Sequence, residues 1–60
     1  MISYVLIINM IAPTGTVVPV SSQKFLELSL CQTVGHEILV EHHKKYPQIF
    51  MSAECRRVYD

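Results

Sequence analysis

The stretch SQKFLELSLCQTVGHEILVEHHKKY, residues 22–46, decides the fold of this 60-residue chain. When successive residues are turned by about 100° around an axis, the apolar ones gather within one arc of roughly 140°. This spacing differs from the strict alternation of a strand, so the stretch predicts one long amphipathic helix. The apolar stripe consists of Leu28, Cys31, Val34, Gly35, Ile38, Leu39, His42 and Tyr46.

Both ends of this helix carry suitable residues. Ser21 or Ser22 can cap the first turn by accepting a hydrogen bond from a free backbone N–H. The basic residues at 42–45 suit the negative end of the helix dipole, and Pro47 disfavours helical geometry before it. Gly35 lies on the apolar stripe, where it predicts close packing against a sheet; a kink at this glycine is the alternative.

Strands are expected on both sides of the helix. Residues 3–12 are rich in Val, Ile and Tyr and are apolar on both faces, as in a central strand. The Pro-Thr-Gly sequence at 13–15 favours a turn, after which residues 16–20 return as a second strand. Pro19 has no N–H to donate and therefore places that strand at an edge. Residues 48–58 form the third strand.

The predicted order is β-β-α-β in a single domain that covers residues 1–60. A right-handed crossover makes the second and third strands parallel to each other, and both are then antiparallel to the first strand between them. The fold class is α+β. The architecture consists of two layers, a three-stranded antiparallel sheet of order 2-1-3 and one long helix.

One helix covers only one face of such a sheet. Half of the residues are hydrophobic, which exceeds what a small two-layer domain easily buries. An exposed apolar patch marks an interaction surface, so the sequence predicts a homodimer packed through its sheet faces or continued edge-to-edge, or another protein partner. The expected surface residues are Val5, Ile7, Ile11, Phe50 and Val58.

The sequence contains no pattern typical of catalysis or metal binding. Its histidines, His36, His42 and His43, do not have the spacing of three or four residues with which a helix presents two ligands to one ion. Cys31 lies on the buried stripe, where an apolar setting makes a thiol inert. We therefore expect neither an enzyme nor a cofactor or metal site.

Two cysteines, Cys31 and Cys55, both fall on faces that point into the core. They form either one disulfide or two small buried thiols. A disulfide is typical of an oxidising compartment, and a secreted or periplasmic disulfide domain is therefore one further hypothesis. Residues 1–23 contain no charged side chain, but turn residues interrupt the apolar run after about twelve positions, too early for a membrane span.

A second function class is a nucleic-acid-binding dimer. Lys44 and Lys45 end the helix, while Arg56 and Arg57 lie late in the last strand, so only a dimer would join them in one basic surface. The formal net charge is zero, and no aromatic residues alternate with these charges to stack on bases. Solvation of the helix end accounts equally for the two lysines.

The strand at 4–8, the turn and strand at 13–20, and the helix with Cys31 before a late Cys55 together resemble a loose group of small bacteriophage and prophage proteins. These proteins have no settled activity, so no functional residue is transferred. The resemblance implies a cytoplasmic accessory protein that binds a host protein or inhibits a host defence protein.

Overall fold

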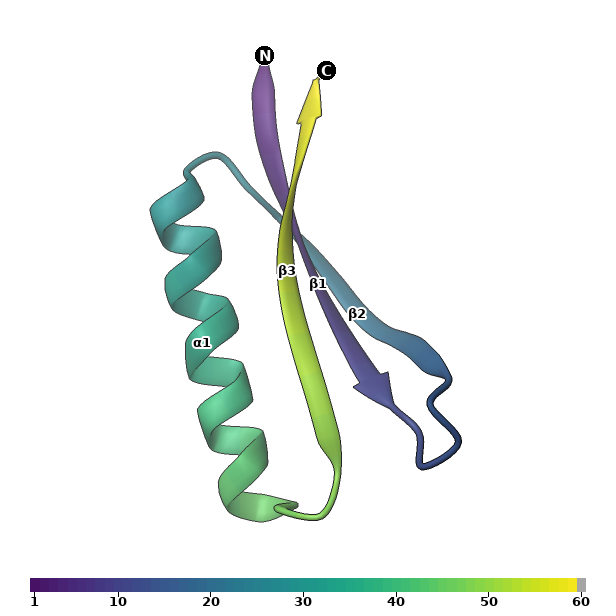
Figure 1. Cartoon of the computed structure of the whole chain (residues 1–60). Helices are drawn as coiled ribbons and strands as arrows, with labels where there is room; N and C mark the ends of the chain where they lie inside the picture. Colours follow the sequence, from purple (N-terminus) through teal and green to yellow (C-terminus); the bar gives the residue numbers. More distant parts are fainter. Residues whose placement is uncertain (60) are drawn as a thin grey trace.

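The computed structural model describes residues 1–59 and confirms the predicted fold class and strand order. Strand β1 in the middle of the sheet pairs antiparallel with both β2 and β3. Helix α1 lies along one face of the sheet (Figure 1). The bounds are Ile2–Ile11 for β1, Val17–Phe25 for β2, Leu28–Lys45 for α1 and Phe50–Tyr59 for β3.

The loop between β1 and β2 follows from its three residues. The N–H of Gly15 donates to the carbonyl of Ala12 at 2.8 Å, and the N–H of Ala12 donates to the carbonyl of Thr16 at 2.9 Å. Gly15 has φ of 90°, a left-handed conformation that a residue without Cβ adopts at no steric cost. Pro13 presets φ at the first loop position, so the loop and strand register agree with the predicted turn.

Strand β2 is longer than predicted. It continues through Phe25 and pairs with β1 as far as Tyr4, whereas the sequence predicted a strand over 16–20 only. The pairing register shifts between Ile8 and Asn9, and Val20 is the extra residue of a β-bulge beside Pro19. A proline at a bulge of an edge strand interrupts no ladder hydrogen bond.

The predicted start of the helix at residue 22 is wrong, since α1 begins at Leu28. Residues 22–25 belong to β2 because they pair with residues 4–7 of β1 and supply partners for its backbone groups. Glu27 is the N-cap, and its side chain makes no capping hydrogen bond, so neither Ser21 nor Ser22 has that role. The third strand likewise begins at residue 50 rather than 48.

The C-terminal end of α1 agrees with the sequence. Tyr46 follows the last helical residue and donates its N–H to the carbonyl of His42 at 2.8 Å. Pro47 begins the turn that leads into β3, and the last turn of the helix is basic throughout. Lys44 and Lys45 place positive charge where the carbonyl end of the helix dipole favours it.

The core lies between α1 and the middle of the sheet. Among residues 1–59 the fully buried apolar side chains are Leu6, Ile8 and Cys31. Half-buried neighbours surround them, namely Tyr4, Phe25, Val34, Ile38, Met51, Ala53 and Cys55. The centre of the predicted helical stripe thus faces the sheet, whereas Leu28 and Tyr46 at its two ends are exposed.

Gly35 is the point of closest approach between the layers. A Cβ added there would lie 2.9 Å from Cδ1 of Leu6 and 3.5 Å from Cβ of Ala53. These distances leave no room for a larger side chain beside the buried Leu6. The helix continues unbroken through this residue, and the two distances support the close-packing interpretation.

We predict that Gly35→Val destabilises the protein by about 2 kcal/mol, because overpacking forces Leu6 from its position. Gly35→Ala should be close to neutral, since a gain in helix propensity of about 1 kcal/mol offsets a smaller overlap. Urea unfolding followed by circular dichroism measures both values. Thr33→Val on the exposed side of α1 is the control, and equal stability of the two valine variants would contradict the packing argument.

Candidate protein-interaction surface

The face of the sheet opposite α1 is defined here as the outer sheet face. Side chains alternate along a strand, so the burial of Leu6 and Ile8 beneath α1 directs Val5 and Ile7 to the other side. No helix or loop of residues 1–59 packs over that side (Figure 1). The outer sheet face thus carries no second layer of helix or loop, although Ser3 near one of its ends is fully buried.

The strand register brings all five predicted surface residues onto this face. The pairs are Ile11 with Phe50 at one end and Ser3 with Val58 at the other, with Val5 and Ile7 between them. Phe50 is 72% exposed, and the other four apolar residues are half-buried by their neighbours within the sheet. These five residues form one apolar track along the sheet, which the polar pair of Asn9 and Ser52 interrupts between Ile7 and Ile11.

Sequence reasoning missed two apolar residues at the ends of this track. Val17 pairs with Ile11 and therefore shares its face, and Met1, which precedes β1, is 80% exposed. The three-residue hairpin loop is the signal that predicts Val17, because a turn at 13–15 places residues 11 and 17 opposite each other. No comparable signal identifies Met1.

Charged residues border the centre of the outer sheet face. Arg56 of β3 donates from Nη2 to Oε1 of Glu54 at 3.1 Å, and both side chains are exposed. On the opposite edge, Lys24 pairs in register with Val5. The apolar centre therefore has a Glu–Arg pair on the β3 side and a lysine on the β2 side.

An open groove runs between β1 and β2 on the same face. It has a volume of about 520 Å³ and is lined by Val5, Ile7, Pro19, Val20, Ser21 and Ser22. Another apolar depression, of about 490 Å³, lies beside Phe50 at the hairpin end of the sheet. Both are shapes that side chains of a partner can fill.

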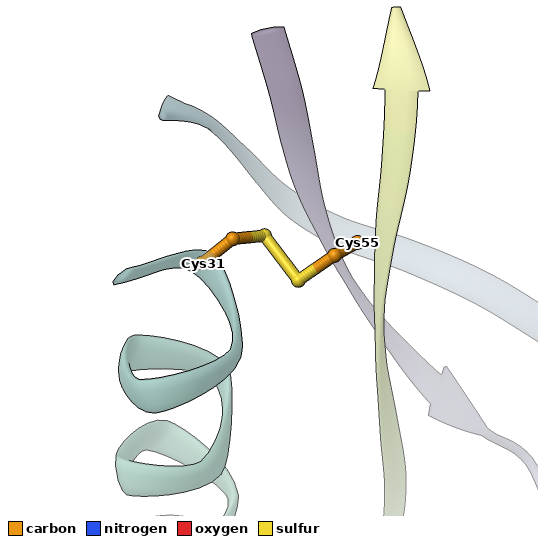
Figure 2. The surroundings of a disulfide bond; sticks show 2 residues. All are labelled: Cys31 and Cys55. Atoms are coloured by element: carbon orange, nitrogen blue, oxygen red, sulfur yellow. A yellow bond between two sulfur atoms is a disulfide. The ribbon is translucent and has the colours of Figure 1, made fainter. Parts of the chain in front are cut away.

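Cys31 and Cys55 form a disulfide, the first of the two alternatives that the sequence left open. The bond joins the first turn of α1 to the middle of β3 (Figure 2), with Cα atoms 6.1 Å apart. Cys31 is fully buried and Cys55 is half-buried. Both line an open groove of about 340 Å³ between α1 and β3.

The basic residues of the nucleic-acid hypothesis lie apart in the structure. Arg56 is next to Cys55, which is bonded to the first turn of α1, whereas Lys44 lies about thirteen residues, or roughly 20 Å, further along the helix. Arg56 and Arg57 also point to opposite faces of β3. The two basic groups thus form no continuous surface on one chain.

Arg57 is held on the helix side of the sheet by aromatic hydroxyls. Its Nη1 donates to the hydroxyl oxygen of Tyr59 at 3.4 Å. This hydrogen bond, together with the electrostatic effects of Tyr59 and Tyr4, raises the pKa of the Arg57 guanidinium above its ordinary value. Arg57 therefore remains charged and is directed away from the outer sheet face.

The histidines show no common site. His36 and His43 are exposed, and the ring of His42 lies 5.1 Å from that of Tyr46 between centroids. Within residues 1–59, no three His, Cys, Asp or Glu side chains are grouped so that they could hold a metal ion.

In the part of the chain that the structure describes, no helix combines the length and the apolar character that a membrane crossing requires. Comparisons with protein-family models, with curated proteins and with solved structures find no match to this chain. The outer sheet face and the disulfide are thus the two features from which a function can be argued.

We predict that reducing the disulfide lowers the free energy of unfolding by about 3.5 kcal/mol, the loop-closure value for a separation of 24 residues. Urea unfolding with and without dithiothreitol measures the difference. A variant with both Cys31→Ala and Cys55→Ala serves as the control, because its unfolding should not respond to the reductant. Identical curves for the oxidised and reduced wild type would contradict this role of the bond.

Proposed function

We propose that this protein is a small homodimeric protein-interaction module whose two copies associate through their outer sheet faces. The observation that carries the proposal is the apolar track across a sheet face that nothing in residues 1–59 covers. Burying such a track removes apolar surface from water, which is the dominant favourable term in most protein association.

The size of the face is consistent with a dimer of this kind. Strands of ten residues are about 34 Å long, and three strands are about 14 Å wide, which corresponds to roughly 480 Å² per copy. Two copies together would bury about 1,000 Å², the lower bound for a specific interface. A dimer therefore needs nearly the whole face, including its ends at Phe50 and Val58.

The charge of the chain also favours association with itself. Its formal net charge is zero, so two copies experience no net repulsion. The charged residues Glu54, Arg56 and Lys24 border the centre of the track, and a polar rim around an apolar centre is the usual anatomy of an interface. The outer sheet face of a second copy has the same apolar centre and the same polar rim.

The partner beyond this dimer follows from the resemblance alone. Similarity to small phage and prophage proteins suggests a module that binds or inhibits a host protein, and it suggests a cytoplasmic setting. The disulfide weighs against that setting, because thiols in the cytosol are kept reduced. We therefore propose that the module acts where the disulfide persists; thiol labelling of the protein taken directly from its native compartment tests this.

We predict that the oxidised protein has a mass near twice 6.9 kDa in size exclusion with light scattering. Ile7→Thr should weaken the dimer by roughly a hundredfold or more, since each copy loses about 1.5 kcal/mol of apolar burial at the centre of the face. Threonine retains β-branching, so the strand should persist, and circular dichroism verifies that it does.

Val40→Thr on the exposed side of α1 is the matched control, and its dimer should be as tight as that of the wild type. A wild-type protein that stays monomeric at millimolar concentration would refute the proposed homodimer.

The nucleic-acid alternative is tested separately. If the protein acts through the outer sheet face, replacing Lys44 and Lys45 together by Glu should leave the dimer unchanged, because both residues lie at the far end of α1. Gel shifts with single- and double-stranded DNA at increasing salt measure whether the protein binds nucleic acid. Salt-sensitive binding that these two substitutions abolish would favour the nucleic-acid function.

A further inference from the structure

We infer that the two copies stack about a two-fold axis that crosses the strands at the level of Leu6 and Cys55, so that Glu54 of each copy faces Arg56 of the other. This inference rests on the proposed homodimer and specifies its geometry. It follows from where the charges of the outer sheet face lie in the strand register.

Two stacked sheets lie about 10 Å apart with strand directions within about 30° of each other. A two-fold axis between two equivalent faces then has two choices. It runs either along the strands, which places β3 of one copy over β2 of the other, or across them, which places β3 over a reversed β3. The side chains that meet differ between these choices.

An axis along the strands brings like charges together. Arg56 and Lys24 both pair in register with Val5, from opposite edges of the sheet. With β3 over β2 at the same level, Arg56 of each copy would face Lys24 of the other, twice per dimer. Like charges at an interface cost several kcal/mol and exclude such arrangements.

An axis across the strands permits several levels, and the charges select one of them. An axis at the level of Val5 places Arg56 over Arg56, and one at the level of Ile7 places Glu54 over Glu54. Only the level between them pairs each glutamate with the arginine of the second copy. The Glu54–Arg56 pair within one chain then becomes part of a four-charge cluster.

The same axis also matches the rest of the face. It places Val5 over Ile7 of the second copy at the centre, and it brings Met1 towards Ile11 and the exposed Phe50 at both ends. Met1 and Phe50, the two most exposed apolar side chains at opposite ends of the face, thereby cover each other.

The test exchanges the charges in separate chains and then mixes them. E54R alone places arginines against arginines, and R56E alone places glutamates against glutamates, so each homodimer should be at least about tenfold weaker than that of the wild type. Mixing E54R with R56E restores opposite charges at all contacts. We expect a one-to-one heterodimer near twice 6.9 kDa, detected by light scattering and native mass spectrometry.

The chain that carries both E54R and R56E is the control. Its net charge equals that of the wild type, and its homodimer should form again, which excludes attraction by net charge alone. Both side chains are exposed, so folding should be unaffected, as circular dichroism verifies.

The outcomes separate this inference from the proposed function. A monomeric wild type refutes both. A wild-type dimer with E54R and R56E homodimers of unchanged affinity, or a mixture of the two that stays monomeric, overturns the two-fold geometry and leaves the homodimer standing. A dimer that joins two β3 edges around Cys55 would also respond to the charge exchange, and Ile7→Thr distinguishes it from the stacked dimer. If the Ile7→Thr dimer is as tight as that of the wild type, the stacked arrangement is overturned.

Discussion

The structure depends on the attachment of α1 to β1 and β3, which rests on one covalent bond and one close contact. The disulfide from Cys31 to Cys55 fixes the first turn of the helix on β3. One turn later, Gly35 allows the helix backbone to approach Leu6 of β1. A chain of this size buries little apolar surface, and so a cross-link that restricts the unfolded chain contributes a large share of its stability.

This attachment leaves the sheet unequal on its two faces. The single helix is used entirely on one side, where it buries Leu6 and Ile8. The alternate residues of β1, Val5 and Ile7, are equally apolar but face away from the helix. β1 is apolar on both faces, but only one face of the sheet is packed against a helix. The apolar residues of the outer sheet face therefore contact either a partner or water.

Much of this architecture could be predicted because it depends on local patterns. Periodicity located the helix, alternation assigned the faces of β1, and the handedness of crossovers ordered the strands. The boundary between β2 and α1 could not be predicted in this way. Residues 22–27 have no strong preference, and their pairing with Tyr4 to Ile7 of β1, a long-range contact, makes most of them a strand.

The surface residues were predictable for the same reason, and the omissions have a physical cause. Alternation alone places Val5, Ile7, Ile11, Phe50 and Val58 on one face once the strands are paired. The bulge at Val20 shifts the register of β2 relative to β1. The β2 residues that flank this face can therefore be identified only from the strand pairing in the structure. The disulfide also stayed open, since the inward direction of two cysteines does not determine their distance.

The disulfide and the outer sheet face are linked through β3. Cys55 points to the helix, so its neighbours Glu54 and Arg56 must point to the opposite side. Fixing the cysteine to α1 therefore fixes the direction and level of both charges, and it prevents β3 from slipping by one residue, which would turn them inward. The bond that holds the covered side together thus also determines what the uncovered side presents to a partner.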